Sequence, residues 1–217
     1  GSVDGTPTEQ IAELLTREFI GKTDFLIDMH SGSANQTLLN HVYSPFVGDE
    51  ELDALTFEFA KATGMQHIVV YGDRPRDPNN SISYPNTAMT RGKPGLTTEI
   101  GHLAQTDEES VAKALDVAKN AMYFLKMLPE TPKQHPEPVI YETIKYPKSS
   151  KNGFFKASVV IGDKVKTGQD VGAVTDYFGN LVETIKSPVD GTVMMVNQMP
   201  AIKDGQSVMA IGVEVSE

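Results

Sequence analysis

His30 is one of two residues whose type and position could support acid–base or metal chemistry. It lies in the segment Ile27-Asp28-Met29-His30-Ser31-Gly32, directly after an apolar stretch that predicts a buried strand. Open α/β sheets bind ligands at the carboxyl ends of their strands, so a histidine there could bind a metal or a substrate. Side chains alternate along a strand, so Asp28 shares a face with His30 and could orient it. Spacing alone also allows a histidine that only caps the turn at Ser31 and Gly32.

The second candidate is Glu99, a carboxylate set in the short apolar segment Leu96-Thr97-Thr98-Glu99-Ile100. We predict a strand here, and burial at its end would raise the pKa of the carboxyl group, which suits a general base. The structural alternative is a glutamate that pairs with an arginine of the preceding loop, such as Arg91. Composition alone does not decide between the two.

A long irregular segment precedes Glu99. Residues 72–95 are rich in Pro, Gly, Asn and Arg, and long irregular segments in compact domains often carry function. Arg74, Arg76 and Arg91 lie here and could hold a substrate carboxylate through paired hydrogen bonds. Such loops also use arginine as surface charge, so each of the three could instead be a solvent-exposed residue that contacts no ligand.

Helices and strands alternate over the first part of the chain. Helices are predicted from Thr6 to just before Gly21, from Asp49 to Gly64 and from Thr106 to about Leu128, with strands at 25–27, 68–71 and 96–100. The first helix start is the best marked, because Thr6 and Glu9 form a capping box and Pro7 takes the favoured first position. This alternation indicates an α/β domain with a largely parallel sheet and helices on both faces.

The pattern changes to short strands and glycine turns after a proline-rich linker at 129–138. We therefore divide the chain into an α/β domain at 1–134 and a small all-β domain at 137–217. Residues 165–174 and 202–211 repeat one another in a single register, each with a glycine turn before a strand. We expect the second domain to fold independently and to be released by proteolysis in the linker.

The repeat resembles the barrel-sandwich fold of biotinyl and lipoyl carrier domains. In such carriers the modified lysine lies on a hairpin, at the position that Asn180 holds here. Asparagine can be neither biotinylated nor lipoylated. We therefore interpret this domain as a structural, oligomerising or access-shaping part, and a homo-oligomer is one possibility.

Composition narrows the classes of partner. The formal net charge is −10, from 29 acidic and 19 basic residues, which argues against binding to nucleic acid. No stretch approaches the ~20 apolar residues that a membrane span needs. The chain has no cysteine, so any metal site must use histidine and carboxylate ligands. We expect a cytoplasmic protein that binds neither nucleic acid nor membrane.

Three landmarks occur in order along the chain. They are Asp4-Gly5-Thr6-x-Thr8-Glu9-x-Ile11-Ala12, then Ile27-Asp28-Met29-His30-Ser31-Gly32, then Arg91-Gly92-x-Pro94-x-Leu96-Thr97-x-Glu99-Ile100-Gly101. With them, the segment from Gly5 through Leu128 resembles the succinylglutamate desuccinylase/aspartoacylase family of zinc-dependent deacylases. The β-rich tail also resembles the tails of many such proteins, so the resemblance covers nearly the whole chain.

The resemblance implies a fold, a cofactor and residue roles. The fold would be a zinc-carboxypeptidase-like mixed sheet with helices on both faces, followed by a barrel-sandwich-like domain. His30 would be a zinc ligand, and Glu99 would be the general base that activates the metal-bound water. The substrate would be a small N-acyl amino acid whose amide bond is cleaved. From the residues themselves, we add Asp28 as a supporting group and Arg91 as a contact to the substrate. His30 and Glu99 should then lie within ~10 Å of each other, close enough to act on one water.

One family motif is absent from this sequence. The family's zinc site also uses a His-x-x-Glu segment, and none of His41, His67, His102 or His135 has an acidic residue three positions later. We therefore interpret the chain as the C-terminal part of a deacylase-like protein, which binds zinc weakly or not at all and is inactive alone. The alternative is a non-catalytic binding or assembly module on the same fold.

Overall fold

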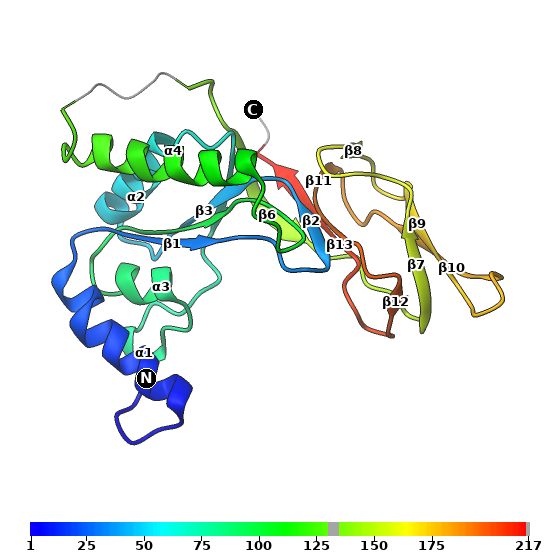
Figure 1. The fold of residues 1–217 in the computed structure, drawn as a ribbon, viewed down its shortest axis with the longest axis horizontal. Helices are drawn as coiled ribbons and strands as arrows, with labels where there is room; N and C mark the ends of the chain where they lie inside the picture. The colour runs from blue at the N-terminus through cyan, green and yellow to red at the C-terminus, as the bar shows by residue number, and fades with distance from the viewer. Residues whose placement is uncertain (130–134, 216–217) are drawn as a thin grey trace.

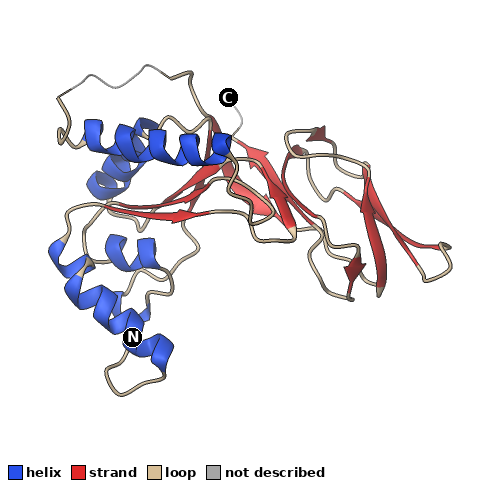
Figure 2. Cartoon of the chain, in the orientation of Figure 1, coloured by secondary structure: helices blue, strands red, loops and turns tan. Residues whose placement is uncertain are grey.

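A large mixed sheet flanked by helices forms the centre of the protein (Figures 1 and 2). The structure is a computed structural model that describes residues 1–129 and 135–215. The α-helices are α1 (Pro7–Glu18), α2 (Glu50–Ala62), α3 (Tyr84–Met89) and α4 (Glu108–Phe124), with short 3-10 helices η1 (Ile20–Lys22) and η2 (Pro78–Asn80). Figure 1 shows α2 and α4 on one side of the sheet and α1 and α3 on the other, as predicted.

Nine strands among the described residues form the large sheet, in the order β1-β5-β3-β4-β6-β13-β11-β2, with β8 paired to β11. They are β1 (Leu26–His30), β2 (Gln36–Leu38), β3 (His41–Pro45), β4 (His67–Tyr71), β5 (Gly95–Glu99), β6 (Val139–Lys145), β8 (Lys164–Val165), β11 (Gly191–Asn197) and β13 (Met209–Glu214). The smaller antiparallel sheet has the order β10-β9-β7-β12. Its strands are β7 (Gly153–Ala157), β9 (Asp170–Thr175), β10 (Leu181–Lys186) and β12 (Ala201–Ile202).

The large sheet is mixed, as the family resemblance implies, rather than largely parallel. β1 runs parallel to β5, but β3 runs antiparallel to β5 before pairing in parallel with β4. β3 is absent from the predicted strands, because His41 and Ser44 are polar residues that obscure its apolar pattern. Both side chains are nevertheless buried. A polar but buried strand gives no clear alternation in the sequence.

The first helix begins as predicted. The Thr6 backbone N–H donates to Oε2 of Glu9 at 2.7 Å, and the Thr6 side chain accepts the Glu9 backbone N–H at 3.5 Å. These two contacts are the capping box, and Pro7 is the first helical residue. Because α1 ends at Glu18 and η1 follows, the chain enters β1 at Leu26 and reaches His30 at the end of that strand.

The last helix differs from its prediction at both ends. Asp107 rather than Thr106 is its N-cap, and Oδ1 of Asp107 accepts the backbone N–H of Ser110 at 2.8 Å. Either residue could cap, but a carboxylate also interacts favourably with the positive end of the helix dipole. The helix ends at Phe124 instead of Leu128, and Lys126 adopts a left-handed φ of 56° just beyond it.

The buried face of β5 determines the direction in which Glu99, on the same strand, points. Leu96 and Thr98 are fully buried and point toward one side of the sheet, so Thr97 and Glu99 point toward the other. Leu96 belongs to a core cluster with residues of α2, α4 and the neighbouring strands, among them Val42, Phe59, Ile68 and Val117. Packing of this core therefore determines which face of the sheet presents the candidate general base.

The large sheet runs across the predicted domain boundary. β6 follows the linker, yet it pairs in parallel with β4 through His67↔Val139 and its neighbours. β2 precedes the linker, yet it pairs with β11 from Gln36↔Asn197 to Leu38↔Met195. The sheet therefore has no break where the sequence division falls. The division into 1–134 and 137–217 stays a prediction, and much of its linker, residues 130–134, lies outside the described residues.

Limited proteolysis tests what this continuous sheet implies. The sequence pattern predicts that cleavage at 129–138 releases the second domain. The continuous sheet leads us to expect instead that both pieces stay associated, because the β4–β6 and β2–β11 pairs still join them. Size-exclusion chromatography of the nicked protein should show one species, which separates only in denaturant. Elution of a folded β fragment alone would instead support two independent domains.

The internal repeat corresponds to two matching turns. Gln169 accepts the backbone N–H of Lys166 through its side-chain oxygen at 2.9 Å, and Gln206 does the same for Lys203 at 3.1 Å. Gly168 and Gly205 adopt similar positive φ values of 82° and 79°, which glycine tolerates best. The repeated sequence therefore encodes a repeated turn. In the described residues the smaller sheet is antiparallel and open, so a closed barrel-sandwich stays a prediction.

Asn180 has a local structural role. It lies in the turn between β9 and β10, where its backbone N–H and its side-chain amide donate to the two carboxylate oxygens of Asp176, each at 2.9 Å. The residue at the carrier position thus holds its own hairpin together. Among the described residues, no helix combines the length and apolar character that crossing a membrane requires.

Candidate active site

The structure brings His30 and Glu99 together at the carboxyl ends of two adjacent parallel strands. β1 and β5 pair in a register that makes His30 and Glu99 direct neighbours. Nδ1 of His30 lies 3.7 Å from Oε1 of Glu99. The expectation that the two residues lie within reach of one water is therefore confirmed, whereas their chemical roles stay predictions.

Asp28 lies on the same face of β1, as its spacing predicts. Its Oδ2 atom is 3.1 Å from Nε2 of His30, so the two ring nitrogens face two different carboxylates. If Nε2 carries the proton toward Asp28, Nδ1 keeps its lone pair on the Glu99 side. A histidine that binds a metal is commonly oriented by a carboxylate in this way. Asp28 is therefore placed to fix both the tautomer and the direction of the His30 ring.

The environment of Glu99 favours a proton acceptor. Burial raises the pKa of its carboxyl group; the nearby His30 opposes that shift, and the charge of Asp28 adds to it. The side chain is only 20% exposed. A carboxylate with a raised pKa binds a proton more readily than a solvated one, which is the property a general base needs. No arginine pairs with Glu99 in the described residues, so the structural alternative of an ion pair with Arg91 is wrong.

His41 is a residue of this site that sequence reasoning does not single out. On β3 it pairs with Glu99 from the side opposite His30, so the three side chains form a row across three strands. Nδ1 of His41 lies 2.7 Å from the carbonyl oxygen of Leu39. Nε2 is buried and has no hydrogen-bond partner among the described residues. Burial lowers the pKa of His41 to about 4, so the ring is neutral at pH 7.

A cavity of about 430 Å³ opens beside His30 and Glu99. Its wall includes the aromatic rings of Tyr43, Tyr71 and Tyr146, and burial raises the pKa of all three hydroxyl groups. The three phenols therefore stay protonated near neutral pH and can donate hydrogen bonds. A cavity of this size, with a few polar groups among aromatic rings, suits a small ligand.

Arg74 rather than Arg91 reaches this cavity. The Arg74 guanidinium lies over the ring of Tyr71, 5.6 Å from its centroid, and belongs to the cavity wall. Arg91 follows α3, where it donates to the Thr87 carbonyl at 3.1 Å and lines a different cavity beside α1. The guanidinium of Arg76 lies against Gly48. The structure thus does not bring Arg91 to the other predicted site residues, because the turn after α3 directs it away from them.

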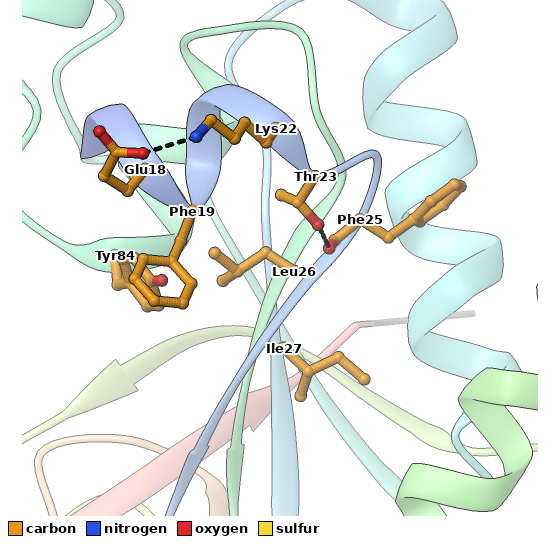
Figure 3. Close-up of a pocket in the computed structure, with 8 residues that line it drawn as sticks. All are labelled: Glu18, Phe19, Lys22, Thr23, Phe25, Leu26, Ile27 and Tyr84. Carbon is orange, nitrogen blue, oxygen red and sulfur yellow. Dashed lines mark hydrogen bonds and ion pairs between the residues drawn. The ribbon is translucent and has the colours of Figure 1, made fainter. Parts of the chain in front are cut away.

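A separate cavity of about 410 Å³ lies near the start of β1 (Figure 3). Phe19, Leu26 and Tyr84 contribute to its wall, and Figure 3 shows the ion pair between Glu18 and Lys22 at its rim. It includes the beginning of β1 instead of the end that carries His30. None of the predicted site residues lines it, so we place no chemistry there.

The metal-ligating side chains of the site do not complete a zinc site. Catalytic zinc commonly has three protein ligands and one open position. His30, oriented by Asp28, fits one such ligand, and Glu99 fits the base beside it. Within 1–129 and 135–215, however, no three His, Asp or Glu side chains are placed to hold a metal. The residues present therefore fit part of a zinc site.

Comparison with known proteins places these features in a family. Over its full length this chain is 26% identical to the N-alpha-acetyl-L-2,4-diaminobutyric acid deacetylase of Halomonas elongata, and it spans 64% of that protein. The product-bound ectoine utilization protein EutE (DoeB) of Ruegeria pomeroyi shares its fold, with a TM-score of 0.87, 24% identity, and coverage of 98% of this chain and 65% of that one.

A succinylglutamate desuccinylase/aspartoacylase from Rhodobacter sphaeroides has the same fold, with a TM-score of 0.86 and 20% identity over all of this chain and 66% of that one. This chain is thus shorter than these relatives by about one third. The sequence pattern described as the Succinylglutamate desuccinylase/Aspartoacylase catalytic domain matches residues 2–125. Those residues contain both strands that carry His30 and Glu99, and the chain belongs to the succinylglutamate desuccinylase/aspartoacylase family.

Proposed function

We propose that this chain is the part of a zinc-dependent hydrolase that carries one zinc ligand and the general base. The reaction is hydrolysis of the amide bond of a small N-acyl amino acid. One observation supports this most strongly: His30 and Glu99 are register partners at strand ends, 3.7 Å apart, beside a cavity of about 430 Å³. The deacetylase of Halomonas elongata acts on a compound of this class, as its name states.

Each residue of the chain has a defined task in this proposal. His30 would hold the metal, and Asp28, whose Oδ2 lies 3.1 Å from Nε2, would keep the ring in the tautomer that leaves Nδ1 without a proton. Glu99 takes a proton from the attacking water and gives it to the leaving amine, so the carboxylate is restored at the end of the cycle. The metal, when bound, supplies a Lewis acid that activates the water and polarises the amide carbonyl.

The finer architecture is part of the same proposal. We assign the α/β part to the zinc-carboxypeptidase type and the β-rich tail to the barrel-sandwich type. The two matching turns at Gly168 and Gly205 support a duplicated β unit. The tail borders the site, because Ile144 and Tyr146 line the same cavity as Glu99. Its role would be to shape access to the site.

Zinc binding tests the proposal. The 217-residue chain alone should bind zinc weakly, since His30 is the one ligand that the described residues place in the site. A longer protein that also carries the family's His-x-x-Glu segment should hold about one zinc per chain and hydrolyse N-acyl amino acids. Metal analysis after gel filtration and an amine-release assay on both lengths measure these outcomes.

Tight, stoichiometric zinc in the 217-residue chain would contradict the assignment of ligands. A longer protein without zinc or hydrolysis would favour the alternative, a non-catalytic binding or assembly module. One observation favours that alternative for the chain taken alone: the described residues place no set of three ligands together.

A further inference from the structure

The wall of the His30–Glu99 cavity has an uneven charge distribution. Of the described residues that line it, Arg74 alone has a permanently positive side chain. Four carboxylates line the same cavity: Asp28, Asp73, Glu99 and Glu142. The lining therefore has four carboxylates and one permanently positive side chain. Asp73 and Glu142 are exposed, so solvent weakens their repulsion of a ligand, whereas Asp28 and Glu99 are largely shielded. A second negative charge on a ligand is unfavourable mainly near Asp28 and Glu99.

The guanidinium of Arg74 is only partly engaged by its neighbours, one of which is the hydroxyl group of Tyr71, which accepts a hydrogen bond from it. The ion-pair contact between Arg74 and Asp73 is weak, because Nε lies 3.8 Å from Oδ1, too far for a good hydrogen bond. The Arg74 side chain is 42% exposed, and the ring of Tyr71 supports it from one side. A guanidinium has five N–H donors, so Arg74 can still offer two of them to a carboxylate through parallel hydrogen bonds.

We infer that Arg74 is the specificity-determining residue that holds the single carboxylate of the N-acyl amino acid, while the surplus carboxylates of the cavity disfavour substrates with a second carboxylate. The preferred substrates are then N-acyl amino acids whose side chain is neutral or positively charged. N-acyl aspartate and N-acyl glutamate are disfavoured. This inference rests on the proposed function for the identity of the substrate, but it concerns binding and is testable without turnover.

Three closely matched ligands test the inference on the 217-residue chain. N-acetylglutamine has one carboxylate, N-acetylglutamate has a second one in nearly the same shape, and N-acetylglutamine α-amide has none. By calorimetry or NMR titration, N-acetylglutamine should bind about tenfold or more tightly than either of the others. These comparisons use the unaltered chain, so they do not depend on whether a variant folds.

Arg74→Gln should weaken N-acetylglutamine binding by about 10- to 100-fold, because a charged hydrogen-bonded pair is lost. Arg74→Lys keeps the positive charge but cannot form the paired hydrogen bonds. Its affinity for N-acetylglutamine should lie between that of the unaltered chain and that of Arg74→Gln. Arg76→Gln is the matched control, because Arg76 lies on the same loop but outside the cavity wall. This variant should bind N-acetylglutamine as tightly as the unaltered chain. Glu142→Gln should narrow the gap between N-acetylglutamate and N-acetylglutamine.

Several results would overturn the inference. They are equal binding of N-acetylglutamine and its α-amide, equal losses in Arg74→Gln and Arg76→Gln, tighter binding of N-acetylglutamate, or no saturable binding up to about 10 mM. Hydrolysis by the longer protein is a separate readout. If the binding order holds but no amide is cleaved, the proposed hydrolase fails and the role of Arg74 stands. If cleavage occurs but does not depend on Arg74, the proposed hydrolase stands and the role of Arg74 fails.

Discussion

Replacing Glu99 by glutamine in the longer protein is expected to lower kcat by about 100- to 10,000-fold, the range that a positioned general base contributes. Glutamine has nearly the same shape as glutamate but cannot accept and return a proton. KM should change little, because the walls of the cavity stay in place. Steady-state kinetics with an N-acetyl amino acid measures both parameters.

Two further variants sharpen this test. Glu99→Asp keeps the carboxylate on a side chain that is one methylene group shorter, so part of the normal kcat should remain. Glu108→Gln changes an exposed glutamate in the first turn of α4 and should leave kcat unchanged. A Glu99→Gln protein with more than about one tenth of the normal kcat would show that another group accepts the proton.

Acid should destabilise the protein through His41. Its pKa is lowered from 6.5 to about 4 in the folded state by burial, so the unfolded chain takes up the proton first. The stability linked to this histidine is therefore complete above pH 6.5, declines as the pH falls, and is lost below the folded-state pKa. The shift corresponds to a loss of roughly 3 kcal/mol in the free energy of unfolding.

His41→Leu should remove this pH dependence. Urea titrations between pH 7 and pH 4 should show a shallower decline in the free energy of unfolding for the variant than for the unaltered chain. His67 is a useful comparison, because burial also lowers its pKa but its side chain is less buried than that of His41. His67→Gln should remove a smaller part of the decline. Identical pH profiles for His41→Leu and the unaltered chain would contradict the neutral, buried state of His41.

The sequence could identify His30 and Glu99 because their signals are local. Each lies at the end of a short apolar strand, and the carboxyl ends of parallel strands meet at one edge of a sheet. Asp28 could be assigned from the alternation of side chains along a single strand. The capping box at Thr6 and the repeated turns also depend on residues within a few positions of each other. Such short-range features need no knowledge of the fold.

Other features depend on contacts that sequence patterns do not encode. Whether Arg74 or Arg91 enters the cavity depends on the path of a long loop, and both arginines fit equally well before that path is known. His41 joins the site only because β3 pairs antiparallel with β5. The pairing of β6 with β4 joins strands on either side of a proline-rich linker. Composition carries no signal of this pairing, so the division into two domains stays a prediction.

The central claim is that His30 binds zinc while Glu99 acts as a base without being a ligand. The most direct test is the zinc content of three purified proteins: the longer protein, its Glu99→Gln variant and its His30→Ala variant. We expect about one zinc per chain in the first two and far less in the third, because only His30→Ala removes a ligand. Loss of zinc from Glu99→Gln, or full retention by His30→Ala, would contradict this account.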